Sequence, residues 1–141
     1  MASMKEITLL YDITQALNEH QDLRKSLYKV MDILSNSLNM VRGTVTILDL
    51  LRNEIHIEVA HGLSQNAVKS VKYKLGEGIT GRVIETGRAI AIPKISEEPL
   101  FLNRTASRGG KQEQELSFIC VPVKKGKQVI GALSVDRPFD K

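Results

Sequence analysis

The chain has 141 residues, of which 42% are hydrophobic and 26% charged, and its formal net charge is +4. This length predicts one domain, residues 1–141, and no apolar run approaches the roughly 20 residues that span a membrane. A single cysteine excludes an internal disulfide and a cysteine-rich metal site, and no apolar secretory signal is present. These features predict a cytoplasmic protein. Residues 1–3, ahead of Met4, are typical of an expression scar.

Residues 4–41 are predicted to form two helices. Apolar residues recur every three or four positions, with a break near residues 18–20. Asp22 is the expected N-cap of the second helix and Gly43 its end. The second helix is apolar on more than one side, which predicts two partners: a sheet, and either the first helix or a second copy of the chain. The residues expected at such a dimer interface are Ile7, Leu10, Ile13, Leu17, Leu27, Tyr28 and Met31.

From residue 43 the apolar period changes to two, which predicts strands. Residues 43–50 and 54–60 indicate a hairpin with one wet face, expected at the edge of the sheet. Residues 93–115 are polar and irregular. The order of elements, long helices first and hairpins later, predicts an α+β fold with an antiparallel sheet. The remaining expected elements are short helices at 64–70 and 79–85 and strands at 71–74, 89–92, 117–123 and 127–136.

Residues 76–83, with the sequence GEGITGRV, have the glycine spacing of a dinucleotide-binding loop. That site needs a crossover helix of ten or more residues and a parallel strand behind it. Only about nine residues separate Gly78 from Gly87, too few for a crossover. We therefore interpret the glycines as a tight turn with positive φ, followed by a short helix that Gly81 lets pack closely against the sheet. The N–H groups at the start of that helix could hold an anion.

No catalytic or metal-binding constellation is predicted. His20, His56 and His61 lack metal-ligand spacing, and Cys120 lies within an apolar strand, where a buried side chain is expected. We expect no cofactor and no enzymatic activity. The basic residues are scattered, so no direct nucleic-acid binding is expected. Residues 124–127, with the sequence KKGK, are typical of a solvated hairpin turn.

Four segments together resemble a GAF domain. They are GEGITGRVIETG at 76–87, AIAIP at 89–93, SFICVPV at 117–123 and GKQVIGALSVD at 126–136. Three further stretches, EPLFLNRT at 98–105, LSFICVP at 116–122 and IGALSVDR at 130–137, resemble the N-terminal GAF domain of NifA-type activators. Those activators are sigma-54-dependent proteins that carry this domain ahead of an AAA+ ATPase and a DNA-binding domain.

The resemblance implies a central antiparallel sheet of about six strands. Two N-terminal helices (4–41) would cover one face, and short helices with a long loop would cover a pocket on the other, within 43–136. It also implies regulation of the ATPase by a small effector, such as 2-oxoglutarate, or by a PII-type signalling protein, in a homodimer. Two alternatives are a dimerisation module without a ligand and a small-molecule enzyme on the same fold.

Strand alternation predicts which side chains face the pocket. Aliphatic sets such as Val45 and Ile47, Ile119 and Val121, and Val129 and Leu133 should pack on the long helices. The opposite sets should face the pocket, and three arginines could place positive charge over it. The predicted ligand-binding residues are Thr46, Gly78, Ile79, Arg82, Phe101, Arg104, Arg108, Phe118, Cys120 and Ser134.

Overall fold

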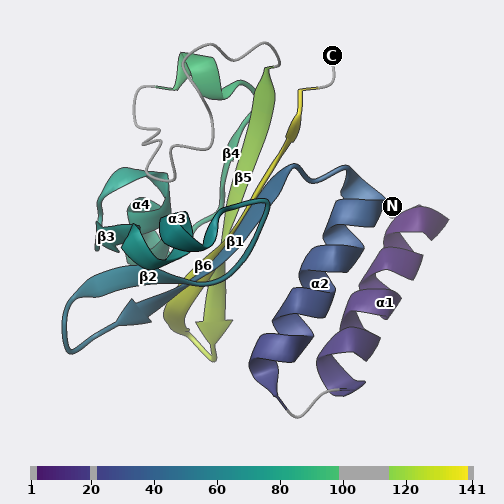
Figure 1. The fold of residues 1–141 in the computed structure, drawn as a ribbon, viewed down its shortest axis with the longest axis horizontal. Coiled ribbons are helices and arrows are strands. Elements are labelled where there is room, and N and C mark those ends of the chain that lie inside the picture. Colours follow the sequence, from purple (N-terminus) through teal and green to yellow (C-terminus); the bar gives the residue numbers. More distant parts are fainter. Residues whose placement is uncertain (1–2, 20–21, 99–114, 140–141) are drawn as a thin grey trace.

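A computed structural model of the chain describes residues 3–19, 22–98 and 115–139. Its core is a six-stranded antiparallel sheet with strand order β3-β2-β1-β6-β5-β4. Helices α1 and α2 lie on one face of the sheet and α4 on the other (Figure 1). The elements are α1 (Met4–Glu19), α2 (Leu23–Leu38), β1 (Arg42–Asp49), β2 (Glu54–His61), α3 (Gln65–Ser70), β3 (Lys72–Lys74), α4 (Gly78–Thr86), β4 (Ile90–Ile92), the 3-10 helix η1 (Ile95–Glu97), β5 (Leu116–Lys125) and β6 (Gln128–Pro138).

The start of α2 confirms the predicted cap, whereas its end differs. The Asp22 side chain accepts a hydrogen bond from the Arg24 N–H at 2.9 Å. The helix ends at Leu38, because Asn39 adopts the left-handed conformation with φ 55°. The prediction that Gly43 ends the helix is therefore wrong. Gly43 lies in β1, where a Cβ would come within 2.5 Å of the Met40 sulfur.

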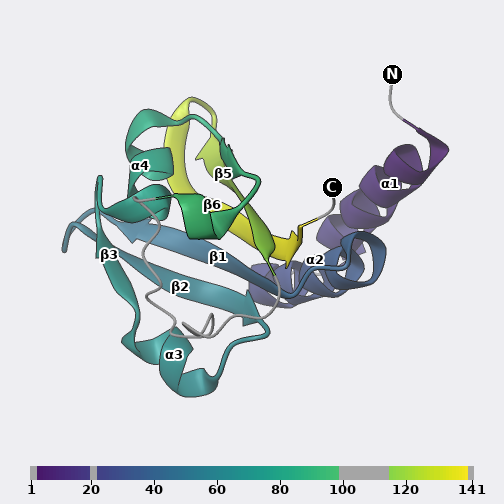
Figure 2. The same cartoon turned by 90° about the horizontal axis from the view of Figure 1, so that it is seen from above.

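Helix α2 has the two partners that its apolar faces predict, the sheet and α1. It packs against β2, and α1 packs chiefly against α2 rather than on the sheet (Figure 2). The predicted helical cover of this face is therefore confirmed, with α2 directly on the strands and α1 reaching the same core through Ala16. The first core cluster lies between these layers and consists of Ala16, Val30, Met31, Leu34, Met40, Val45, Val59 and Val135.

The seven residues predicted for a dimer interface differ in how far they are buried within the protomer. Met31 is 1% exposed and belongs to this core, so its placement at an interface is wrong. Its position on the helical wheel turns it toward the sheet. Ile13 and Leu27 are half-buried against the same core. The other four, which remain exposed on α1 and α2, are Ile7, Leu10, Leu17 and Tyr28.

The β1–β2 hairpin lies inside the sheet, so its predicted edge position is wrong. Strand β3 pairs with β2 on its outer side, from Glu54–Lys74 to His56–Lys72. The pairing also shifts within the hairpin: Val45 pairs with Val59, but Thr46 pairs with Ile57. Glu58 is therefore an extra residue in β2, and such a bulge moves the following side chains to the opposite face. Val59 accordingly joins the first core, while Ile55 joins a second one.

The second core lies on the face of the sheet toward α4, which we call the α4 face. The opposite face is called the α2 face. Buried residues of α4, β2, β4, β5 and β6 meet there: Ile55, Ile79, Val83, Ile84, Ile92, Phe118, Cys120 and Ala132. Val45, Ile47, Leu133 and Val135 contact the first core, and Phe118, Cys120 and Ala132 the second. This division confirms most of the predicted alternation.

Two aliphatic residues, Val129 and Ile119, differ from the burial that the predicted strand alternation gives them. Val129 packs with the second core, because the pairing jumps from Val123–Gly131 to Lys124–Val129 and leaves Ile130 as an extra residue. Ile119 is on the α2 face as predicted, but it is 45% exposed. Helix α2 packs on the same face but toward the opposite edge of the sheet, against β2, so it does not cover β5 and leaves Ile119 exposed.

Candidate functional site

The glycine segment forms the turn and helix that the sequence predicts. Gly76 and Gly78 have φ values of 84° and 65°, and α4 then runs for nine residues to a left-handed Gly87. A Cβ on Gly81 would lie 2.7 Å from the Lys74 carbonyl oxygen and 3.0 Å from backbone atoms of Gly76. Gly81 therefore permits close packing against the end of β3 and the turn itself.

The α4 face carries two adjacent rows of polar side chains on a largely apolar surface. In the first row, Arg42 Nε donates to Asp136 Oδ2 at 3.0 Å, and the Asp136 residue is 1% exposed. In the second row, the hydroxyls of Thr44 and Ser134 lie 2.6 Å apart. Strand pairing places Arg42 opposite Asp136 and Thr44 opposite Ser134. A buried polar surface of this kind is typical of a ligand site or of an interaction that fixes the fold.

The strand residues predicted for the site share this face. Ser134 is 7% exposed and Phe118 6% exposed, and Phe118 pairs with Asp136 on β5 and β6. Thr46 is buried too, and its hydroxyl donates to the Ala132 carbonyl at 3.3 Å. That hydroxyl already has an acceptor within the sheet. The structure thus brings Thr46, Phe118 and Ser134 together with Cys120 on one surface.

Cys120 is fully buried between β4 and β6. Burial raises the pKa of its thiol to about 12, and a hydrogen bond with the Thr80 side chain opposes this in part. A thiol that stays protonated at neutral pH is a poor nucleophile. The structure therefore gives Cys120 the environment of a core residue.

The residues predicted on α4 divide between core and solvent. Ile79 is buried in the second core, and Gly78 forms the first turn of the helix. Arg82 is exposed, whereas Gly81 and Val83 beside it are buried. It therefore projects from the outer side of α4. Phe101, Arg104 and Arg108 lie outside the described residues.

Sequence reasoning did not single out Arg42, Thr44 or Asp136 as site residues. The signal was available in the parity of β1 and β6, since Arg42 and Thr44 alternate with Val45 and share the face of Thr46. Arg42 begins one apolar strand and Asp136 lies near the end of another, and antiparallel pairing of these two strands would have pointed to the ion pair.

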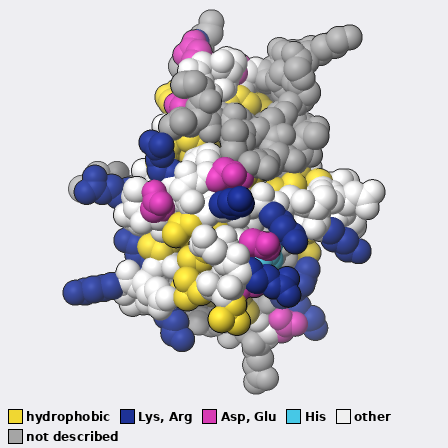
Figure 3. Space-filling view, turned by 90° about the vertical axis from the view of Figure 1, so that its left-hand side faces the viewer, with side chains coloured by type: hydrophobic (Ala, Val, Ile, Leu, Met, Phe, Trp, Pro, Cys, Tyr) yellow, Lys and Arg dark blue, Asp and Glu magenta, His cyan; other side chains and the backbone are white. Residues whose placement is uncertain are grey.

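The described residues show neither a metal cluster nor a membrane span. They contain no group of three or more potential metal ligands, and none of their helices is long and apolar enough to cross a bilayer. Lys and Arg side chains are spread around the visible α4 side of the molecule rather than gathered in one patch (Figure 3). The exposed Lys124, Lys125 and Gly126 end β5 and turn into β6, as predicted.

Comparison with known proteins identifies relatives of the whole chain. The nitrogen fixation protein VnfA of Azotobacter vinelandii is 41% identical over 95% of this chain and 26% of the relative. The Nif-specific regulatory protein of Azospirillum lipoferum is 38% identical over 96% of this chain and 22% of the relative. The chain thus spans about a quarter of the curated relatives that it matches.

A solved structure matches the fold closely. The GAF domain of A. aeolicus nlh2, crystallised in an inactive state, superposes with a TM-score of 0.85 at 29% identity, covering 98% of this chain and 82% of that one. The model of the GAF domain family matches residues 22–141. With its six-stranded antiparallel sheet between two layers of helices, the chain belongs to the GAF domain family, and its relatives include a nitrogen fixation protein and Nif-specific regulatory proteins.

Proposed function

We propose that the chain is the non-enzymatic regulatory domain of a sigma-54-dependent transcription activator of the nitrogen-fixation type. In this role it binds a small effector or a partner protein and thereby controls an AAA+ ATPase domain of the same polypeptide. The relatives that share 38–41% of its residues are regulators of nitrogen fixation, which supports a regulatory role. The observation that carries effector binding is the pair of buried polar rows on the α4 face.

Burying these two polar rows costs folding free energy that apolar side chains at the same positions would not cost. Burying an ion pair removes two charges from water, and apolar residues of similar volume often stabilise a fold as well or better. The Arg42–Asp136 pair and the Thr44–Ser134 hydroxyls interrupt a face whose other members, Thr46 apart, are aliphatic, aromatic or thiol side chains. Together they offer donors and acceptors for a polar ligand.

We propose a small anionic metabolite, such as 2-oxoglutarate, as the effector. Hydroxyl and guanidinium donors suit a carboxylate, and Arg82, Arg104 and Arg108 are the sequence-predicted sources of further positive charge. A PII-type signalling protein is the proposed protein effector. Neither effector requires metal or cofactor chemistry from this chain.

Calorimetry with 2-oxoglutarate tests the site. Binding should be measurable for the unmodified domain and should weaken at least tenfold in Ser134→Val, which removes a hydroxyl of the polar row. Ser35→Ala, a hydroxyl removed from α2 and so away from the α4 face, is the control and should bind as the parent does. Arg104→Ala tests the predicted arginine separately. Absence of heat with the unmodified domain would exclude this ligand, and equal affinity of Ser134→Val and the parent would exclude the polar row.

We further propose that the domain forms a homodimer through α1. Met4, Ile7, Leu10, Tyr11 and Leu17 are 44–77% exposed, and they lie along the side of α1 that turns away from α2. An exposed apolar stripe of this length is typical of a helix that packs against another helix. Tyr28 of α2, 43% exposed, could extend the same surface.

A dimerisation module without a ligand is the second candidate. It is favoured by the second core, in which side chains of α4 and the sheet pack directly against each other. A thermal-shift screen of cytosolic metabolites, with and without a PII-type protein, separates the two candidates. An increase in Tm with one metabolite favours the sensor, and an unchanged Tm throughout favours the module.

A further inference from the structure

The pairing of β4, β5 and β6 places an apolar row and a polar row side by side on the α2 face. In the apolar row, Ala91 pairs with Ile119, which in turn pairs with Val135. In the next row toward the end of β6, Ser117 pairs with Arg137. Residues two apart on a strand point to the same side, so Arg137 shares the face of Val135, roughly 7 Å farther along the strand.

An apolar groove of about 340 Å³ is lined by both rows. Ile119 is 45% exposed in it, because α2 packs against β2 and leaves β5 uncovered. Leu38, the last residue of α2, lines the groove from the helical side, and Ala91 lines it from the edge strand. Small-molecule sites have volumes of about 300–1,000 Å³ and mostly apolar walls. The groove therefore suits a small ligand with an aliphatic part.

Arg137 is the charged end of this groove. Among the described residues that line it, Arg137 alone carries a charge, and it forms no ion pair with a described carboxylate. The adjacent Asp136 points to the opposite face, where it pairs with Arg42. Ser117 is not a donor for a ligand, because its hydroxyl donates to the Pro93 carbonyl at 2.6 Å. The guanidinium is thus the donor group that the described part of the groove offers.

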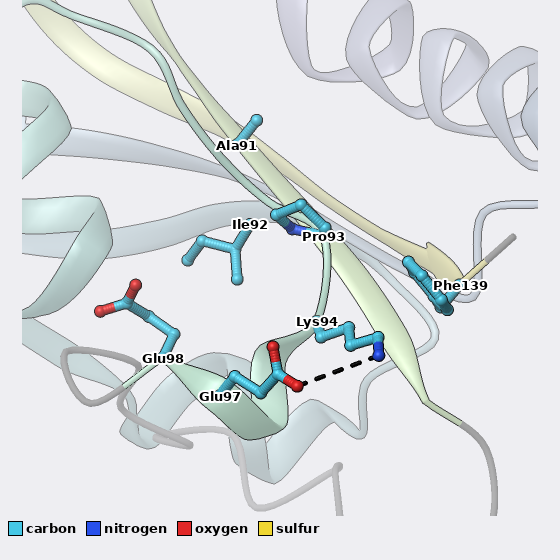
Figure 4. Close-up of a pocket in the computed structure, with 7 residues that line it drawn as sticks. All are labelled: Ala91, Ile92, Pro93, Lys94, Glu97, Glu98 and Phe139. Carbon is cyan, nitrogen blue, oxygen red and sulfur yellow. Dashed lines mark ion pairs between the residues drawn. The ribbon is translucent and has the colours of Figure 1, made fainter. Parts of the chain in front are cut away.

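A neighbouring groove shares residues 91–93 but holds its own charges together (Figure 4). Its Lys94 ammonium lies 3.9 Å from the Glu97 carboxylate, the pair that the dashed line marks, and 5.0 Å from the centre of the Phe139 ring. Lys94 is therefore engaged within the protein. Arg137 remains as the cation beside the apolar row.

We propose that the apolar groove binds a small aliphatic carboxylate, a medium-chain fatty acid such as octanoate. The chain lies over Ile119 between Leu38 and Ala91, and the carboxylate accepts hydrogen bonds from the Arg137 guanidinium. Each methylene that is fully buried raises the affinity about threefold to fourfold, and the planar guanidinium matches a carboxylate in geometry and charge. This site lies on the opposite face from the Thr44–Ser134 row, and the inference does not depend on effector binding there.

An NMR titration of the ¹⁵N-labelled domain with octanoate tests the proposal. Amide shifts should change at Ala91, Ile119 and Arg137 and stay constant at Thr44. Octanol keeps the chain without the carboxylate, and octylammonium reverses the charge, so each should bind at least about fivefold more weakly than octanoate. Butanoate keeps the carboxylate on a shorter chain and should bind at least about tenfold more weakly.

Two variants locate the contacts. Arg137→Gln should weaken octanoate about fivefold and leave octanol unchanged. The matched control is Arg88→Gln, at an exposed arginine outside the groove, which should leave both ligands unchanged. Ala91→Phe, at an exposed position of the edge strand, should fill the groove and weaken both.

Three outcomes would overturn the proposal. The first is an absence of shifts at Ile119 at millimolar octanoate, or equal octanoate affinity of Arg137→Gln and the parent. The second is a set of shifts centred on Thr44, which would assign octanoate to the α4 face. The third is a shift at Ile119 that grows with domain concentration alone, which would assign the groove to a second copy of the chain.

Discussion

Arg42 and Asp136 join the start of β1 to the end of β6 through an ion pair of 3.0 Å, with side chains that are 11% and 2% exposed. The main chain reinforces this link, because the Val41 N–H donates to the Asp136 carbonyl at 2.8 Å. Asp136 therefore holds both the side chain and the backbone of the segment that leads from α2 into the sheet.

Removing the carboxylate of Asp136 should strongly destabilise the domain. Asp136→Ala leaves the Arg42 charge buried without its carboxylate, a change that typically costs about 3–5 kcal/mol of unfolding free energy. The double variant Arg42→Met/Asp136→Leu should recover most of this loss, since it removes both charges and keeps the volume. Urea unfolding monitored by circular dichroism measures both. A loss below about 1 kcal/mol for Asp136→Ala would contradict a buried, coupled pair.

The Cys120 thiol should be protected from reagents and should make stability fall at high pH. Its pKa is about 12 in the folded protein and near 9.0 in an exposed thiol. Between these values the unfolded chain releases a proton that the folded chain keeps. The stabilisation that the protonated thiol gives to the free energy of unfolding is therefore complete below pH 9 and is lost as the pH rises toward 12.

Comparison with Cys120→Ala isolates this effect from other groups that titrate at high pH. The difference in unfolding free energy between the parent and Cys120→Ala should shrink as the pH rises from 8 to 11. Native protein should also react with a thiol reagent at pH 8 far more slowly than unfolded protein. A native reaction rate equal to the unfolded rate would show that the thiol is accessible.

Ser26→Ala should leave the domain as stable or make it more stable. The Ser26 side chain is 1% exposed, and its hydroxyl oxygen has no hydrogen-bond partner within the part of the chain that the structure describes. A buried unsatisfied hydroxyl costs about 1–3 kcal/mol, and alanine is also the better helix former. Ser35→Ala, at a half-buried position of the same helix, controls for helix propensity. A loss of more than about 1 kcal/mol in Ser26→Ala would indicate a bound partner for the hydroxyl.

Charge on the α1 stripe should disrupt the proposed dimer. Leu10 is 62% exposed, so Leu10→Lys should leave the fold intact while it opposes burial of the stripe. Sedimentation velocity at tens of micromolar should show a dimer for the parent and a monomer for Leu10→Lys. Thr8→Lys, on the polar side of α1, is the matched control and should remain dimeric. A monomeric parent would exclude self-association through α1 in this chain.

Much of the fold could be predicted because the apolar period changes from helical to alternating at residue 43. The two long helices, the glycine turn and the β5–β6 hairpin follow from local patterns. The interior position of the β1–β2 hairpin could not, since it depends on β3, a strand of three residues. The helix end at Asn39 was missed because glycine is the usual signal and asparagine is the less common alternative.

Only part of the candidate site could be predicted from the sequence. Alternation placed Thr46, Phe118, Cys120 and Ser134 on one surface, because side chains of a regular strand follow a period of two. It could not show that Arg82 projects from the outer side of α4, because a helix of nine residues has few positions from which to judge its buried side. Parity also puts Arg42 and Asp136 on that surface, but their contact joins residues 94 positions apart and depends on the pairing of β1 with β6, which local patterns do not give.

The extra residues Glu58 and Ile130 limit where relatives can gain or lose a residue. Each marks the point where its strand changes the face to which it sends its side chains. Deleting either residue would restore regular alternation and send the apolar residues on one side of it into the wrong layer. Relatives that keep both cores should therefore preserve chain length at these two positions while their side chains vary. An alignment of the family should show gaps in its turns but none at these two places.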